Sequence, residues 1–281
     1  LADWGVGYRE VALRPDGSPD MEAIRRAVTP EVKLVEIQRS KGYEWRKSLF
    51  VEDIRAICSC VKEVNPSVIC MVDNCYGEFA EKEEPCQAGA DLAVGSLIKN
   101  PGGGMALTGA YVAGRSDLVE QVSYRLTSPG IGAEVGASLG MNRGMYQGFF
   151  MAPHVVAESM KTALLAARML EILGYEVCPP SSEARGDIIQ AVKLGSADKL
   201  CAFCQGIQAG SPVDSYVTPE PWDMPGYENQ VIMAAGTFVS GASIEISADG
   251  PLREPYIAYM QGGLTYESGK LAVLCAVSRM L

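Results

Sequence analysis

The chain has 281 residues, of which 48% are hydrophobic and 21% are charged, and this ordinary globular composition excludes a disordered chain. The net charge is −10 and no Lys/Arg-rich run occurs, so nucleic acid and an anionic membrane surface are excluded as partners. No apolar stretch approaches the roughly 20 residues that a bilayer span requires, and the length suits one large domain or two unequal ones.

Helical and strand-like patterns alternate in the first half of the sequence. We expect a capped helix within residues 17–28, and further helices over 51–64 and 116–125. Short apolar runs predict strands over 32–38, 67–73, 90–96 and 109–114, and residues 127–140 form a Gly-rich connection. Strands that alternate with helices in this way predict βαβ units and a three-layer α/β domain.

The longest helical pattern covers residues 153–173 and ends at Gly174, a residue typical of helix C-termini. The pattern then changes: a segment over 187–194, strands over 202–207, 228–239 and 243–247, and a closing helix over 268–281 suggest a smaller α+β domain. We therefore predict that residues 1–152 form the large domain, 153–174 a linking helix, and 175–281 a small C-terminal domain.

The chain contains a single histidine, His154, which limits its chemistry. A multi-histidine metal centre within one chain is excluded, and a hydrolase triad would have to use this residue, whose place at the start of a long helix favours a capping or packing role. Cys201 and Cys204 have redox or zinc spacing, but no second pair or nearby His completes a ligand set, so we expect buried thiols and no metal. The nine scattered cysteines favour a reducing, cytoplasmic location.

Four polar side chains follow two apolar strand segments. Asp73 ends the first segment and Tyr76 comes three residues later, while Ser96 and Lys99 end the second, just before Gly102-Gly-Gly104. Ligands of open α/β sheets gather at the carboxyl ends of the strands. We therefore expect these side chains to share one site.

This set of groups suits pyridoxal phosphate (PLP). An aldehyde cofactor requires an amine for a Schiff base, and Lys99, between an apolar strand and a neutral Gly-rich loop, is expected to have the lowered pKa that makes a lysine nucleophilic. The pyridine nitrogen requires an anion such as Asp73. Tyr76 can donate to the ring oxygen and Ser96 can reach the phosphate.

Each of these residues also has an ordinary interpretation. A lone lysine is usually a solvated surface group, an aspartate after a strand is usually a turn or N-cap residue, and three glycines can form a hinge or an untypical phosphate loop. It is their order at two strand ends that favours a cofactor site.

Longer sequence segments resemble those of a known family. Asp73-Asn-Cys-Tyr76 and Ser96-Leu-Ile-Lys99 resemble elements of fold-type-I PLP enzymes. The chain resembles most closely the methionine gamma-lyase-like family, often labelled aluminium-resistance proteins, through phrases at 72–79, 95–104, 125–132, 211–216 and 261–266.

This resemblance implies a PLP-dependent transferase fold with Lys99 as the Schiff-base lysine, Asp73 as the partner of the pyridine nitrogen, and Ser96 as a phosphate contact. It also implies homodimers or homotetramers with the active site at the dimer interface. Such enzymes commonly bind the substrate carboxylate through an arginine, for which Arg253 is our candidate, with an exposed turn residue as the equal alternative. Family members carry over a hundred residues before the point where this sequence begins, so we expect a partial large domain, truncated at its N-terminus.

The implied reaction is carbon–sulfur lysis of an amino acid, in which the Lys99 amine removes the α-proton. Two alternatives stay open at the level of sequence. One is another PLP reaction on the same scaffold, such as transamination, and the other is a catalytically incomplete fragment that acts as a dimer-forming or binding module.

Overall fold

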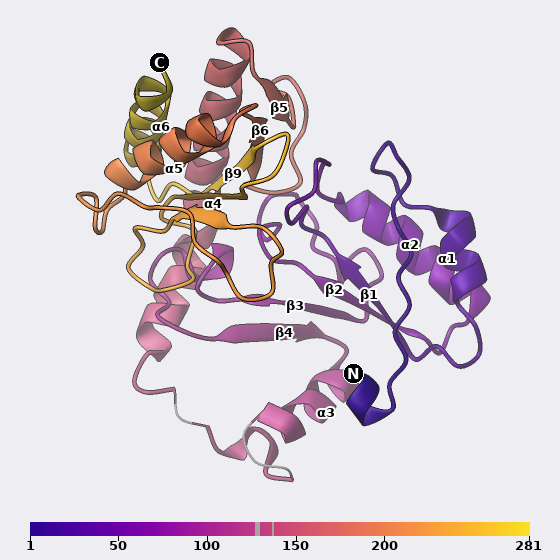
Figure 1. Cartoon of the computed structure of the whole chain (residues 1–281). Coiled ribbons are helices and arrows are strands. Elements are labelled where there is room, and N and C mark those ends of the chain that lie inside the picture. The colour runs from indigo at the N-terminus through magenta and orange to yellow at the C-terminus, as the bar shows by residue number, and fades with distance from the viewer. Residues whose placement is uncertain (127–129, 137) are drawn as a thin grey trace.

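The computed structural model describes residues 1–126, 130–136 and 138–281, and Figure 1 shows the course of the chain. The helices are α1 Met21–Ala27, α2 Val51–Val64, α3 Ser116–Leu126, α4 Asn142–Ile172, α5 Ala197–Ala209 and α6 Tyr266–Met280, with short 3-10 helices η1 Ala2–Trp4, η2 Asn100–Gly102 and η3 Gly132–Glu134. The strands are β1 Leu34–Gln38, β2 Ile69–Asp73, β3 Leu92–Ser96, β4 Ala110–Gly114, β5 Glu176–Cys178, β6 Gln190–Lys193, β7 Val231–Ala234, β8 Ser247–Pro251 and β9 Ile257–Gln261. The predicted mixed α/β class is confirmed.

The first sheet has the strand order β1-β2-β3-β4, and β1, β2 and β3 run parallel. Helices α1 and α2 pack against it, and the buried side chains of Ile54, Val61, Cys70 and Val72 form part of the core between them. Strand β4 runs antiparallel to β3, so these two strands do not form one of the predicted βαβ units. Residues 97–109, which join these two strands, contain only the short η2 and no crossover helix, and a parallel pair is usually connected by such a helix.

The second sheet has the order β5-β6-β9-β8-β7 and is antiparallel throughout. Side chains of α4, α5 and α6 form its largest core with the apolar side chains of the strands; Leu170, Phe203 and Ile246 are among the buried residues. The first and second sheets are also connected by Lys41, which is buried. Its ammonium group donates to the backbone carbonyls of Cys178, at 3.3 Å, and Ile189, at 3.4 Å.

Helix α4 reaches from η2, beside the first sheet, to the second sheet (Figure 1). It begins at Asn142, eleven residues before the predicted start, because Pro153 lies inside the helix instead of opening it. His154 is therefore an exposed residue within the helix, and its predicted place at a helix start is wrong. Gly174 follows the helix with a positive φ of 84°, as expected for a glycine that ends a helix. The division of the chain into domains remains a prediction.

Residues 202–207, predicted as a strand, lie in helix α5. Helix α5 packs closely against α6 there: a Cβ added at Gly206 would lie 2.3 Å from Cα of Ala276 in α6. Cys204 is accordingly buried and Cys201 half-buried on this helix. The strand predicted over 243–247 begins instead at Ser247, and β9 was not predicted.

Residues 127–129 and 137 lie outside the described residues. They belong to the predicted Gly-rich connection over 127–140, and 127–129 also belong to the motif over 125–132. Among the helices of the described segments, none combines the length and the apolar character that crossing a bilayer would require.

Candidate active site

Asp73 is the last residue of β2, and the chain turns sharply after it. The Asp73 carboxylate accepts a hydrogen bond from the backbone N–H of Cys75, at 3.1 Å. Tyr76 has a positive φ of 72°, an unfavourable conformation for a bulky residue. The turn is held by Arg39, which is fully buried and donates to the side-chain oxygen of Asn74, at 2.7 Å, and to the carbonyl of Gly77, at 3.0 Å. This scaffold fixes the direction in which the Tyr76 ring points.

Ser96 is the last residue of β3, the neighbouring parallel strand, in which Val94 pairs with Asp73. The chain then turns through Lys99 into η2, and the turn is too tight for a side chain at Gly102. A Cβ there would lie 1.8 Å from the carbonyl oxygen of Leu97. The ends of β2 and β3 therefore lie at one edge of the sheet, as the sequence predicts.

The Lys99 amine lies over the ring of Tyr76, with Nζ 4.5 Å from the ring centroid. Burial lowers the pKa of Lys99, but the nearby Tyr76, Cys75 and Asp73 side chains outweigh this effect and raise the pKa above its usual range. The expected lowering of the pKa is therefore wrong for this structure. The reason is that the sequence shows the apolar strand and the glycines around the lysine, but not the acidic groups that face it.

Tyr76 also contacts a cavity of about 190 Å³ between the two sheets. Its phenol oxygen accepts a hydrogen bond from the Ser243 hydroxyl, at 3.5 Å, and burial raises the pKa of the phenol. Because the Tyr76 ring faces both Lys99 and this cavity, a molecule that enters the cavity comes within reach of the lysine site. We take the strand ends and the cavity together as the candidate active site.

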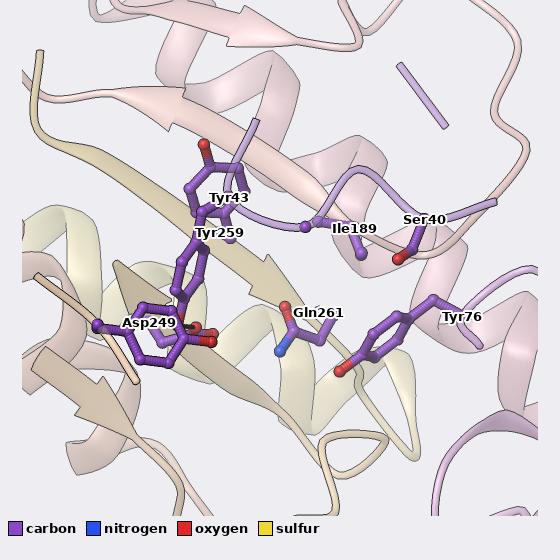
Figure 2. A pocket seen from close by; sticks show the side chains of 9 residues that line it. Ser40, Tyr43, Tyr76, Ile189, Asp249, Tyr259 and Gln261 are labelled. Carbon is purple, nitrogen blue, oxygen red and sulfur yellow. Dashed lines mark hydrogen bonds between the residues drawn. The ribbon is translucent and has the colours of Figure 1, made fainter. Parts of the chain in front are cut away.

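The other walls of the cavity come from segments far apart in the sequence. They include Tyr43, Tyr227, Asp249, Tyr259 and Gln261. Figure 2 shows Tyr43, Tyr259 and Asp249 gathered at one side of the cavity and Tyr76 at the other, with Gln261 between them. Sequence reasoning missed these residues as functional candidates. The signal available was weak: Gln261 begins the segment 261–266 that carries part of the resemblance, but no role follows from it, and Asp249 lies four residues before the Arg253 candidate.

Of the predicted site residues, the structure brings Asp73, Tyr76 and Lys99 together and places Ser96 at the same sheet edge. Arg253 is not among these residues, although it is near Tyr259 in the cavity wall: burial raises the pKa of Tyr259, and the Arg253 charge opposes this effect. Arg253 is exposed in the turn between β8 and β9 and does not line the cavity, so its role as carboxylate ligand remains a prediction.

A buried carboxyl group, Glu78, supports the loop beside Lys99. One carboxyl oxygen accepts a hydrogen bond from the Tyr111 hydroxyl, at 2.9 Å, while the Glu78 carbonyl accepts one from the Asn100 side chain, at 3.1 Å. Burial raises the pKa of Glu78 to about 8, with a smaller contribution from the neighbouring Glu84. Glu78 is therefore mostly protonated at neutral pH.

Comparison with known proteins identifies a family and several relatives of this chain. The model of the family described as "Methionine gamma-lyase" matches residues 1–281. The uncharacterized protein YnbB of Bacillus subtilis is 54% identical over all of this chain, which spans 67% of YnbB.

Two solved structures show the same similarity. A carbon-sulfur lyase involved in aluminum resistance from Clostridium novyi is 52% identical, with a TM-score of 0.95, and the match covers 100% of this chain and 66% of that one. A Listeria innocua protein, also described as involved in aluminum resistance, is 53% identical with a TM-score of 0.97, and the match covers 100% of this chain and 69% of that one. The resemblance read from the sequence is therefore confirmed: the chain belongs to the methionine gamma-lyase family.

Proposed function

We propose that this chain forms the catalytic part of a PLP-dependent carbon–sulfur lyase that acts on amino acids. The observation that carries the proposal is the position of the Lys99 amine, 4.5 Å from the centroid of the Tyr76 ring, at the strand edge where Asp73 ends β2. The Clostridium novyi relative, which is described as a carbon-sulfur lyase, supports the type of reaction.

The residues present fit PLP. Lys99 supplies an amine, Asp73 an anion at the end of β2, and Ser96 and Tyr76 supply hydroxyl groups at the same edge. Gly102 allows the tight turn that follows Lys99, since a Cβ at this position would clash with the carbonyl oxygen of Leu97. When bound, PLP supplies an electron sink for the electrons that a broken bond at the α-carbon leaves behind.

The side chains of the chain itself would bind and move protons. Asp73 would hold a proton on the pyridine nitrogen, and Ser96 would donate to the phosphate. Lys99 would take the α-proton of the amino acid as general base. Because the pKa of Lys99 is raised without the cofactor, the amine is protonated at neutral pH. A proton must therefore leave it before it can act as nucleophile or base.

The exposed apolar side chains at the start of α4 support the proposal that the chain forms homodimers or homotetramers. Tyr146 is 77% exposed, Phe149 55% and Phe150 82%, and such a patch of large apolar groups is typical of an interface. We propose that this part of α4 lies against a second copy of the chain.

The test of the cofactor site is the visible absorption spectrum of the chain with PLP, recorded for the unmodified chain, for Lys99→Ala, and for Lys270→Ala as the control, since Lys270 is exposed on α6. We expect an absorption band that Lys270→Ala retains and Lys99→Ala loses. A band that survives in Lys99→Ala would refute the assignment of the lysine.

The type of reaction is tested by the products formed from a sulfur-containing amino acid. A ketoacid with ammonia and a thiol would support the lyase. A ketoacid with pyridoxamine phosphate would show transamination instead, and would refute the proposed reaction while leaving the cofactor site intact.

A further inference from the structure

Arg39 follows β1, is fully buried and does not line the cavity. Its backbone N–H donates to the carbonyl of Asp73, at 3.1 Å, and this bond extends the pairing of β1 with β2 to the residue where the sharp turn begins. A buried cation persists in a fold only where acceptors surround it. The partners of the Arg39 side chain therefore indicate which segments it holds together.

Each nitrogen of the Arg39 guanidinium has an acceptor. Nη1 donates to two acceptors within the turn after β2, and Nε donates to the carbonyl of Leu49, at 3.2 Å. Nη2 pairs with the carboxylate of Glu81, at 2.5 Å, and the same carboxylate oxygen accepts the backbone N–H of Val51 at the start of α2, at 3.0 Å. The arginine thus joins the turn after β2 to the segment that begins α2.

The turn is shaped around this side chain. A Cβ added at Gly77 would lie 2.4 Å from Nη1 and 2.5 Å from Cζ of Arg39, so the guanidinium packs directly on the backbone of Gly77. The preceding residue, Tyr76, has the positive φ of 72°. A bulky residue keeps such a conformation only where its surroundings enforce it. The bonds of Arg39 to Asn74, before Tyr76, and to Gly77, after it, supply that constraint.

The conformation of Tyr76 decides what faces the lysine amine. Its ring lies against Lys99, with Nζ 4.5 Å from the ring centroid, and the face of an aromatic ring stabilises an ammonium group. Burial lowers the pKa of Lys99, and Tyr76 contributes most to the opposing rise. We propose that Arg39 is a positioning residue of the lysine site, which holds the Tyr76 ring against the Lys99 amine through the turn. This inference rests on the proposed function, since it concerns the lysine of that same site.

The inference differs from a purely structural role in what it predicts for Lys99. Without the bonds from Arg39, Tyr76 would relax from its positive φ, and its ring would leave the amine. The protonated form of Lys99 would lose this stabilisation, so the pKa of the amine would fall. An arginine that only stabilised the fold would lower the free energy of unfolding and leave the protonation of Lys99 unchanged.

The experiment follows the protonation of Lys99 directly, in the whole chain without cofactor. The chain is labelled with 13C-lysine, and the chemical shift of the Lys99 ε-carbon is recorded against pH by NMR, with the signal assigned by its loss in Lys99→Ala. We expect Arg39→Lys, which keeps the charge but not the fork of donors, to move the midpoint to lower pH. The unprotonated fraction of the amine at pH 8 should rise about threefold or more.

Arg143→Lys is the matched control, because it makes the same change at an exposed position on α4 and should leave the Lys99 midpoint unchanged. Gly77→Ala tests the same contact without removing the arginine, since the new Cβ would displace the guanidinium, and it serves where Arg39→Lys does not fold. It should move the midpoint in the same direction, whereas Gly7→Ala, in open space, should not. An unchanged midpoint in Arg39→Lys or Gly77→Ala would overturn the inference.

A double substitution tests whether Arg39 acts through Tyr76. Tyr76→Leu removes the ring and should by itself lower the midpoint of Lys99. Added to Tyr76→Leu, the change Arg39→Lys should then shift the midpoint no further, because the ring that Arg39 positions is already gone. Shifts that add in the double variant would refute this route.

The result is separate from that of the cofactor test, since no PLP is present. A Lys99-dependent absorption band with PLP, together with a Lys99 midpoint that ignores Arg39→Lys, would contradict this inference alone. No such band, together with the expected shifts of the midpoint, would contradict the proposed function alone.

Discussion

The substitution Glu78→Gln tests whether burial keeps this carboxyl group, beside the loop that carries Lys99, protonated at neutral pH. The glutamine side chain can accept the hydrogen bond from Tyr111 as the acid does, and it resembles the protonated carboxyl group in shape. Glu78 is 3% exposed, and burial raises its pKa from the ordinary value of 4.5 to about 8. The substitution therefore removes a charge that the folded chain resists forming. It also adds N–H donors where the second Glu78 oxygen has no partner among the described residues, a cost that does not change with pH.

The sign of the effect follows from proton binding. Between pH 4.5 and 8 the folded chain holds a proton on Glu78 that the unfolded chain has released, so the free energy of unfolding falls as the pH rises through this interval. Each pH unit contributes about 1.36 kcal/mol, and the interval of about 3.5 units amounts to about 5 kcal/mol. Glu78→Gln escapes this loss, so its free energy of unfolding relative to the unmodified chain should rise by about 5 kcal/mol between pH 4.5 and pH 8.

The assay is urea unfolding of the two chains at pH 5, 6, 7 and 8. Glu36→Gln on β1, where the side chain is exposed, is the matched control and should follow the unmodified chain at every pH. A difference between Glu78→Gln and the unmodified chain that stays constant from pH 5 to pH 8 would refute the reasoning. So would a difference that shrinks with rising pH, since that would mean Glu78 is ionised in the folded chain.

The other predictions concern helix packing and a thiol in the site. Gly206→Ala should lower the free energy of unfolding by about 1–3 kcal/mol, because the new Cβ would lie 2.3 Å from Cα of Ala276. The control Gly7→Ala, where a Cβ would meet open space, should change it by less than about 0.5 kcal/mol. Urea unfolding measures both values, and equal effects would contradict the close packing of α5 and α6. Cys75 should react slowly with iodoacetamide, because burial raises the pKa of its thiol to about 11 and leaves only about 0.1% as thiolate at pH 8. Mass spectrometry of the alkylated chain checks this, and modification of Cys75 as fast as that of free cysteine would show that the thiol is open to solvent.

Much of the first sheet was predictable because its signals are local. Residues 51–64 have helical spacing and stop at Asn65-Pro66, and the helix α2 has these bounds. The apolar run before Asp73 predicts a buried parallel strand, and Asp73 does end β2 beside β3. The carboxyl ends of neighbouring parallel strands lie at the same edge of a sheet. The sequence therefore also predicted that Tyr76, after β2, and Lys99, after β3, lie near each other.

The features that sequence reasoning missed depend on contacts between distant residues. The apolar residues at 202–207 fit a strand, but they lie in helix α5, where Gly206 packs closely against α6. Pro153 suggested a helix start, but α4 continues through it from Asn142. The direction in which the pKa of Lys99 shifts depends on how Tyr76 and Cys75 face the amine, and sequence spacing does not specify this arrangement.

The walls of the cavity have a consequence for how the chain folds. Tyr43 and Asp249, which share a hydrogen bond, are 206 residues apart in the sequence, and Ser40 and Gln261 also line the same space. No segment that folds by itself around one sheet contains both sides, so the cavity forms only when the two sheets dock. A ligand in the cavity therefore favours the docked arrangement over any partly opened form, and its binding should suppress local opening, measurable as slower amide hydrogen exchange at β8 and β9.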